Sequence, residues 1–159
     1  MSAALAVLWN VFALVLYQLG IAYACSRLSG ASVEKPRWLY EQKPFEKSGK
    51  FYDVFAIKKW KDRLPDAGGF FKGGFSKNQL RDKDKAYLAV FILETKRGEL
   101  AHWLQIPPAG LFFLWNDAAG GTVICLYALL FHLPFIAAQR YNRLRLNRLL
   151  KRMEKQQTI

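Results

Sequence analysis

Two ionisable residues that stand three positions apart, Glu99 and His102, form the pair in this sequence best suited to chemistry. They lie in the stretch 94–103, directly before a long run of uncharged residues. If the stretch is helical, residues three apart share a face, so the carboxylate can reach the imidazole. Glu94 and Arg97 are also three apart, on a different face, and Glu94 lies about 12 Å from His102 along the helix axis.

This pair supports three interpretations. A carboxylate that binds one imidazole nitrogen raises the basicity of the other, which makes His102 a candidate general base, Glu99 its orienting partner and Glu94 a further candidate catalytic residue. The Glu-x-x-His spacing also occurs in helical metal sites, so a divalent metal on Glu99 and His102 is a second hypothesis, with Glu94, Asp62 or Asp66 as further ligands. In the third interpretation the two side chains only satisfy each other at a membrane interface.

The elements around the pair are predicted to be membrane helices. Charge in this 159-residue chain is segregated: residues 2–26 contain no Asp, Glu, Lys or Arg, and between residues 100 and 139 only Asp117 is charged. Residues 3–24 would span roughly 33 Å as a helix, enough to cross a bilayer. We predict an all-α, small integral membrane protein, a single domain over 1–159 with about three transmembrane helices.

The second and third spans are predicted at about 100–115 and 122–138, joined by a turn at 115–121 that is rich in Asn, Asp and Gly. Pro107 and Pro108 predict a kink or break in the second span, and Pro134 a bend in the third. A cleaved signal peptide that ends before Cys25 is an alternative interpretation of the first apolar segment, although that segment has no basic residues at its start.

Lysine and arginine predict the orientation. The block 27–99 holds seventeen of the 24 basic residues and the tail 140–159 holds the other seven. The positive-inside rule therefore places both in the cytoplasm, with the N-terminus outside, in a multi-pass protein of the cell membrane. The tail combines Leu146, Leu149 and Leu150 with basic residues at helical spacing, which predicts an amphipathic helix along the membrane surface.

The block 27–99 is rich in aromatic residues and is predicted to be an interfacial, helical cytoplasmic loop. A helix is expected from Ser48 to about Trp60, and another from Asp82 or Asp84 that continues into the second span. Although the net charge is +12, no nucleic-acid-binding motif is present, and basic residues beside apolar spans favour lipid headgroups as partners instead. The adjacent residues Arg140, Tyr141, Asn142 and Arg143 could bind a phosphate or headgroup.

Four blocks follow one another along the chain: 45–52 (FEKSGKFY), 59–66 (KWKDRLPD), 94–103 (ETKRGELAHW) and 134–145 (PFIAAQRYNRLR). Together they resemble the glycosyl-4,4'-diaponeurosporenoate acyltransferase family. The resemblance implies a membrane acyltransferase that esterifies a sugar hydroxyl of a glycosylated C30 carotenoid, the last step of staphyloxanthin-type pigment synthesis. The acceptor would be that carotenoid glycoside or another membrane lipid, and the donor acyl-CoA or an acyl-carrier thioester.

On this interpretation His102 is the base and Glu99 orients it, and no Ser or Cys in the motif offers a nucleophile. The substrate-binding candidates are Arg97, Lys59, Lys61, Arg140 and Arg143 for donor phosphates, and Trp60, Asp62, Asp66, Tyr141 and Asn142 for the rest of the substrate. A metal-dependent lipid-modifying hydrolase and a non-enzymatic lipid-binding subunit are the alternatives. Three spans are few to enclose a lipid, so a homodimer would supply further surface.

Overall fold

The computed structural model describes residues 3–47, 50–65 and 84–157, and every regular element among them is helical. This confirms the all-α prediction. The α-helices and 3₁₀ helices (η) are, in order, α1 (Ala3–Arg27), α2 (Gly30–Glu34), α3 (Arg37–Tyr40), η1 (Pro44–Glu46), α4 (Lys50–Val54), α5 (Ile57–Trp60), η2 (Lys61–Arg63), α6 (Lys85–Gln105), η4 (Pro107–Leu114) and α7 (Ala118–Gln157).

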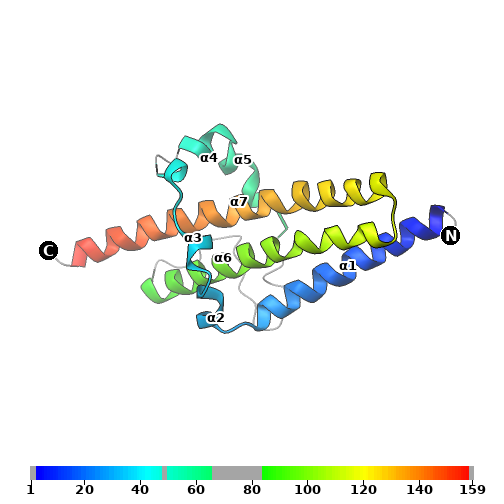
Figure 1. Cartoon of the computed structure of the whole chain (residues 1–159). Coiled ribbons are helices and arrows are strands. Elements are labelled where there is room, and N and C mark those ends of the chain that lie inside the picture. Colours follow the sequence, from blue (N-terminus) through cyan, green and yellow to red (C-terminus); the bar gives the residue numbers. More distant parts are fainter. Residues whose placement is uncertain (1–2, 48–49, 66–83, 158–159) are drawn as a thin grey trace.

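Three long helices form the body of the molecule (Figure 1). α1 and α7 run in the same direction, and α6 runs in the opposite direction between them, so the two chain termini lie at opposite ends. α4 and α5 lie on the far side of α7 from α1, while α2 and α3 lie beside α6 near its N-terminal end. These four short helices therefore flank the N-terminal half of α6 and the middle of α7.

Two apolar clusters of buried side chains lie on either side of a layer of buried polar residues. One cluster joins η4 to α7 through Phe112, Ile124 and Ala128, with residues of α1 packed against it. The other joins the N-terminal part of α6 to the C-terminal part of α7 through Leu88, Phe91 and Leu146. Between the clusters the buried face of α6 carries Thr95, Glu99 and Gln105, and that of α7 carries His132 and Arg143. Fully buried polar groups need partners inside the protein, so this layer is where specific contacts are expected.

Two helices of the described chain, α1 and α7, are long and apolar enough to cross a membrane. The predicted second span, about 100–115, is not one α-helix. α6 ends at Gln105, and Pro107–Leu114 continue as a 3₁₀ helix. The break at the two prolines was predicted, because proline has no N–H to donate and its ring obstructs the preceding turn. α1 packs against this region, where the Tyr17 hydroxyl and the Gln105 amide nitrogen donate across the helices at 3.2 and 2.8 Å to the carbonyls of Gln105 and Gln18.

α7 extends well beyond the predicted third span. It begins at Ala118, where the Asp117 carboxylate accepts from the Gly120 N–H at 2.7 Å, and it continues through Pro134 to Gln157. The predicted separate tail helix is thus the last part of α7. Its apolar side chains, Leu149, Leu150 and Met153 among them, pack on α6, whereas the prediction placed them on the membrane surface. Periodicity identified this apolar face but not what covers it, because a neighbouring helix and a bilayer bury the same stripe.

Two further expectations concern the loop. α6 begins where predicted, with the Asp84 carboxylate accepting from the Ala86 N–H at 3.0 Å, and it runs unbroken through the charged stretch to Gln105. The helix expected from Ser48 to Trp60 is instead divided into α4 and α5 by Ala56, whose φ of 47° is left-handed. Ser48 itself lies outside the described residues.

Candidate functional site

Arg140 is the centre of a buried ion network between α7, α6 and the loop. Its Nε and Nη2 donate to the two carboxylate oxygens of Glu46, both at 2.9 Å, which is the fork geometry that guanidinium and carboxylate groups favour. Its Nη1 donates to Glu99 Oε1 at 2.8 Å and to the Leu39 carbonyl at 2.7 Å. Nη2 also reaches the Glu41 carbonyl at 3.0 Å. The Arg140 side chain thus joins α7 to α6 and to the loop segment 39–46.

Glu99 is held by a second arginine as well. Its other oxygen accepts from Arg143 Nη1, and the Trp103 indole N–H lies 3.4 Å from Oε1. Glu99 has no solvent exposure, and Arg143 lies over the ring of Tyr40 with 5.2 Å to its centroid. Burial and the nearby Glu99 charge raise the pKa of Tyr40 to about 12. Two guanidinium groups therefore offset the charges of Glu99 and Glu46 inside the protein.

Glu46 makes two further hydrogen bonds. Its carboxylate accepts from the Tyr52 hydroxyl at 2.5 Å and from the Lys43 N–H at 2.7 Å. Burial by itself would raise the pKa of Glu46, but the hydrogen bonds from Arg140, Tyr52 and the Lys43 backbone outweigh it and lower that pKa to about 2. Burial and the Glu46 carboxylate in turn raise the pKa of Tyr52. Glu46 is consequently ionised at neutral pH.

This pKa predicts how stability depends on pH. A carboxyl group whose pKa falls from 4.5 unfolded to about 2 folded stabilises the fold fully above pH 4.5, and the contribution is lost as the pH falls toward 2. Between pH 6 and pH 3 the Glu46 share of this loss should be about 2 kcal/mol. Thermal unfolding in detergent at both pH values measures it. Glu46→Gln should lower stability at pH 6 but show a smaller further loss at pH 3; an equal loss in both proteins would contradict the assignment.

The two histidines of the chain contact each other across α6 and α7. Nδ1 of His102 lies 3.0 Å from Nδ1 of His132, a hydrogen bond in which one ring donates and the other accepts. The ring of Phe135 stacks on His102 with 4.7 Å between centroids. His132 is fully buried and its Nε2 has no hydrogen-bond partner among the described residues, whereas His102 is partly exposed. This arrangement gives His102 a fixed ring orientation.

The predicted pairing of Glu99 with His102 is not the arrangement found. Both oxygens of Glu99 are held by Arg140 and Arg143, and His102 is instead paired with His132. Helical spacing showed only that the two side chains share a face of α6. The face of α7 that packs against α6 supplies charged donors to Glu99. A charged donor binds a carboxylate more strongly than a neutral imidazole does.

The metal hypothesis receives no support from the donor set. No group of three or more His, Cys, Asp or Glu side chains within the described residues is placed to share an ion. Glu94, proposed as a further ligand or catalytic residue, accepts from Arg97 Nε at 2.9 Å, the contact that their spacing suggested. Asp62 is paired with Lys61, and Asp66 lies outside the described residues.

The other predicted binding residues divide between structural and surface positions. Arg97 donates to the carbonyls of Cys25 and Leu28 at 2.8 and 2.7 Å, so it ties the end of α1 to α6. The Trp60 indole donates to the Phe55 carbonyl at 2.9 Å, Lys59 is exposed, and Asn142 is half-buried on α7. None of these residues lies in the network around Arg140, and the predicted cluster of ligands for one substrate is therefore dispersed.

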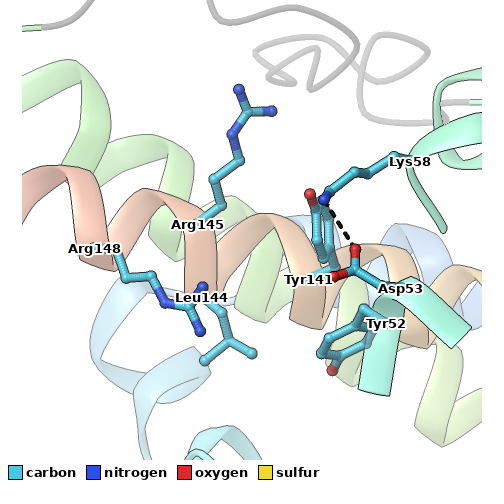
Figure 2. Close-up of a pocket in the computed structure, with 7 residues that line it drawn as sticks. All are labelled: Tyr52, Asp53, Lys58, Tyr141, Leu144, Arg145 and Arg148. Atoms are coloured by element: carbon cyan, nitrogen blue, oxygen red, sulfur yellow. Dashed lines mark hydrogen bonds and ion pairs between the residues drawn. The ribbon is translucent and has the colours of Figure 1, made fainter. Parts of the chain in front are cut away.

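Tyr141 does line a pocket, of about 280 Å³, on the outer side of α7 (Figure 2). Its ring packs edge-on against that of Tyr52, with 5.6 Å between centroids, and Tyr52 directs its hydroxyl to Glu46. The remaining lining residues are Asp53, Lys58, Leu144, Arg145 and Arg148. Tyr52 therefore both lines the pocket and binds the ion network.

Sequence reasoning missed Glu46 and His132. Glu46 lies within the block 45–52 that carried the family resemblance, but its role depends on Arg140, 94 positions away. His132 had a recognisable signal: the chain contains two histidines, both in apolar segments, where ionisable side chains are seldom without function.

Comparison with known proteins identifies the class. The sequence profile of the glycosyl-4,4'-diaponeurosporenoate acyltransferase family matches residues 36–152. Proteins named glycosyl-4,4'-diaponeurosporenoate acyltransferase from Staphylococcus aureus strains Newman and COL are each 30% identical over 138 residues, which cover 86% of this chain and 83% of theirs. No solved structure matches.

These matches define an acyltransferase. The chain belongs to the glycosyl-4,4'-diaponeurosporenoate acyltransferase family. The matched range contains the whole ion network and both histidines.

Proposed function

We propose that this acyltransferase transfers a fatty acyl group from a thioester donor to a sugar hydroxyl of a glycosyl carotenoid, glycosyl-4,4'-diaponeurosporenoate or a close relative. The names of its relatives support the acceptor. The observation that carries the catalytic assignment is the 3.0 Å contact between His102 and His132, beside a layer of fully buried charges.

His102 is the proposed general base. When its Nδ1–H donates to Nδ1 of His132, its Nε2 keeps a lone pair and can accept the proton of an alcohol. The imidazolium formed is stabilised by the hydrogen bond to neutral His132 and by the π face of Phe135 stacked on it. His132 thus takes the orienting role that the sequence assigned to Glu99, and Glu99 with Arg140 holds α6 and α7 in register.

The proposed reaction is direct transfer. The sugar hydroxyl loses its proton to His102 Nε2 as its oxygen attacks the thioester carbonyl carbon, the C–S bond breaks, and the thiolate takes the proton back from His102. The products are an ester and a free thiol, and no oxidant or metal is required. A base of this kind contributes ~10²- to 10⁴-fold to the rate.

We propose a placement in the membrane that suits this chemistry. We place α1, the segment 100–114 and the first part of α7 in the bilayer, with the basic loop and the end of α7 in the cytoplasm. Residues 100–105 of α6 rise about 1.5 Å each, and residues 107–114 of the 3₁₀ helix rise about 2 Å each. The segment 100–114 therefore extends roughly 25 Å, close to the ~30 Å of a hydrocarbon core. The histidines then lie just inside the cytoplasmic boundary, where a sugar headgroup meets a fatty acyl thioester.

The test is a direct assay of the purified protein in nanodiscs. Incubation with glycosyl-4,4'-diaponeurosporenoate and a fatty acyl-CoA should give the acylated glycoside, detected by mass spectrometry, together with free coenzyme A. A donor panel that includes an acyl-carrier thioester extends the test. Absence of ester with every donor, from protein shown to be folded, would overturn the proposal.

A further inference from the structure

The pocket beside Tyr141 contains two arginines that have no acidic partner among the described residues. Arg145 and Arg148 are three residues apart on α7, both are exposed, and no described residue forms an ion pair or hydrogen bond with either. Figure 2 shows them on one side of the pocket, with Tyr52, Tyr141 and Lys58 on the other. Lys58 is already paired with Asp53 at 2.9 Å, so, within the described part of the chain, the two guanidinium groups are the unpaired charges that line this pocket.

The rest of the lining is suited to a ligand that is partly flat and apolar. Tyr141 presents part of its ring to the pocket, and Tyr52, which is only 3% exposed, packs against it. Leu144 lies between these rings and the arginines, and the volume of about 280 Å³ is just below the usual range of ligand sites. Guanidinium groups bind phosphate oxygens through paired N–H donors, and aromatic rings bind flat heterocycles.

We propose that this pocket binds a phosphate-bearing group, either the nucleotide phosphates of a coenzyme A thioester or the phosphate of an anionic lipid headgroup. The first of these rests on the proposed function, because it makes the pocket the donor site of the acyl transfer. It is also a different site from the predicted phosphate ligands, since Arg140 and Arg143 are occupied by Glu46 and Glu99.

The position of the pocket fits a donor. Leu144 is twelve residues after His132 on one continuous helix, which corresponds to roughly 18 Å along the axis. The pantetheine arm of coenzyme A is an extended chain that separates its thioester from its phosphates. With phosphates held by Arg145 and Arg148, this arm has to reach roughly 18 Å along α7 and round from its outer side to the histidines.

The experiment measures binding, not turnover. Full-length protein in neutral phosphatidylcholine nanodiscs is titrated with free coenzyme A, and phosphatidylglycerol retention is followed separately by native mass spectrometry. The double variant R145Q/R148Q is compared with K151Q/R152Q, which removes two exposed charges of the same helix that do not line the pocket. We expect the pocket variant to lose at least tenfold in affinity for coenzyme A and the control to change less than twofold.

The results of these two binding measurements distinguish coenzyme A from an anionic lipid as the source of the phosphate. Loss of coenzyme A affinity assigns the pocket to the donor, and loss of phosphatidylglycerol retention alone assigns it to a lipid headgroup. If neither ligand distinguishes R145Q/R148Q from K151Q/R152Q, the pocket is not a phosphate site. Because no turnover is needed, a protein that binds coenzyme A in this pocket yet forms no ester contradicts the proposed function and leaves the pocket assignment intact.

Discussion

Replacing Arg140 by alanine should destabilise the protein more than any other single substitution considered. Its guanidinium offsets the carboxylates of Glu46 and Glu99, neither of which has any solvent exposure, and it also satisfies the Leu39 and Glu41 carbonyls. Removal of one partner from a buried ion pair costs about 3–5 kcal/mol, because the remaining charge stays buried. We expect thermal unfolding in detergent to begin on the order of 10 °C lower.

Two variants make that result specific. Arg152→Ala removes an exposed arginine from the same helix and should change stability little. Arg140→Lys keeps the charge, but one ammonium group cannot bind both oxygens of Glu46 and one oxygen of Glu99 at the same time. The melting temperature of this variant should therefore lie between those of the wild type and Arg140→Ala. Equal melting temperatures for Arg140→Ala and Arg152→Ala would show that the network does not stabilise the fold.

His102→Ala should lower acyl transfer by ~10²- to 10⁴-fold while the protein remains folded. The reason is the loss of the proposed base. His132→Ala should cost less, since it removes the orienting partner and leaves the base in place. The double variant should be about as slow as His102→Ala alone, because residues that act as a unit are not additive.

The matched control is Leu104→Ala. Leu104 is two residues from His102 and about half exposed on the outer side of α6, so its loss should leave turnover near wild type. Rates are measured with saturating donor, and melting temperatures confirm that each variant is folded. Turnover close to wild type in folded His102→Ala would exclude this residue as the base and would redirect attention to the Arg140 network.

Local chemistry explains which elements were predictable. The start of α6 follows from the Asp84 cap, the break after Gln105 from two prolines, and the contact of Glu94 with Arg97 from their spacing. Each of these depends on residues within one or two helical turns. The division of the expected helix at Ala56 was not predictable, because nothing in the local sequence demands a left-handed residue there.

The contacts in the candidate site, by contrast, join residues that are far apart in the sequence. His102, Glu99, Arg140 and Arg143 were all singled out from the sequence, yet the contacts that they make inside the protein were not predicted. Glu99 meets an arginine 41 positions away, and His102 meets a histidine 30 positions away. Contacts at such separations depend on how two helices align, which periodicity does not specify.

The sequence by itself determined that the chain is helical, where its apolar segments lie, which charged residues flank them, and that the blocks resemble an acyltransferase family. These are properties of composition and of local spacing. Only the tertiary structure decided that α7 is one helix packed along α6, that Arg140 offsets two buried carboxylates, and that the histidines face each other. The physical reason is that a buried charge binds the strongest donor that packing brings to it, and packing is a property of the whole chain.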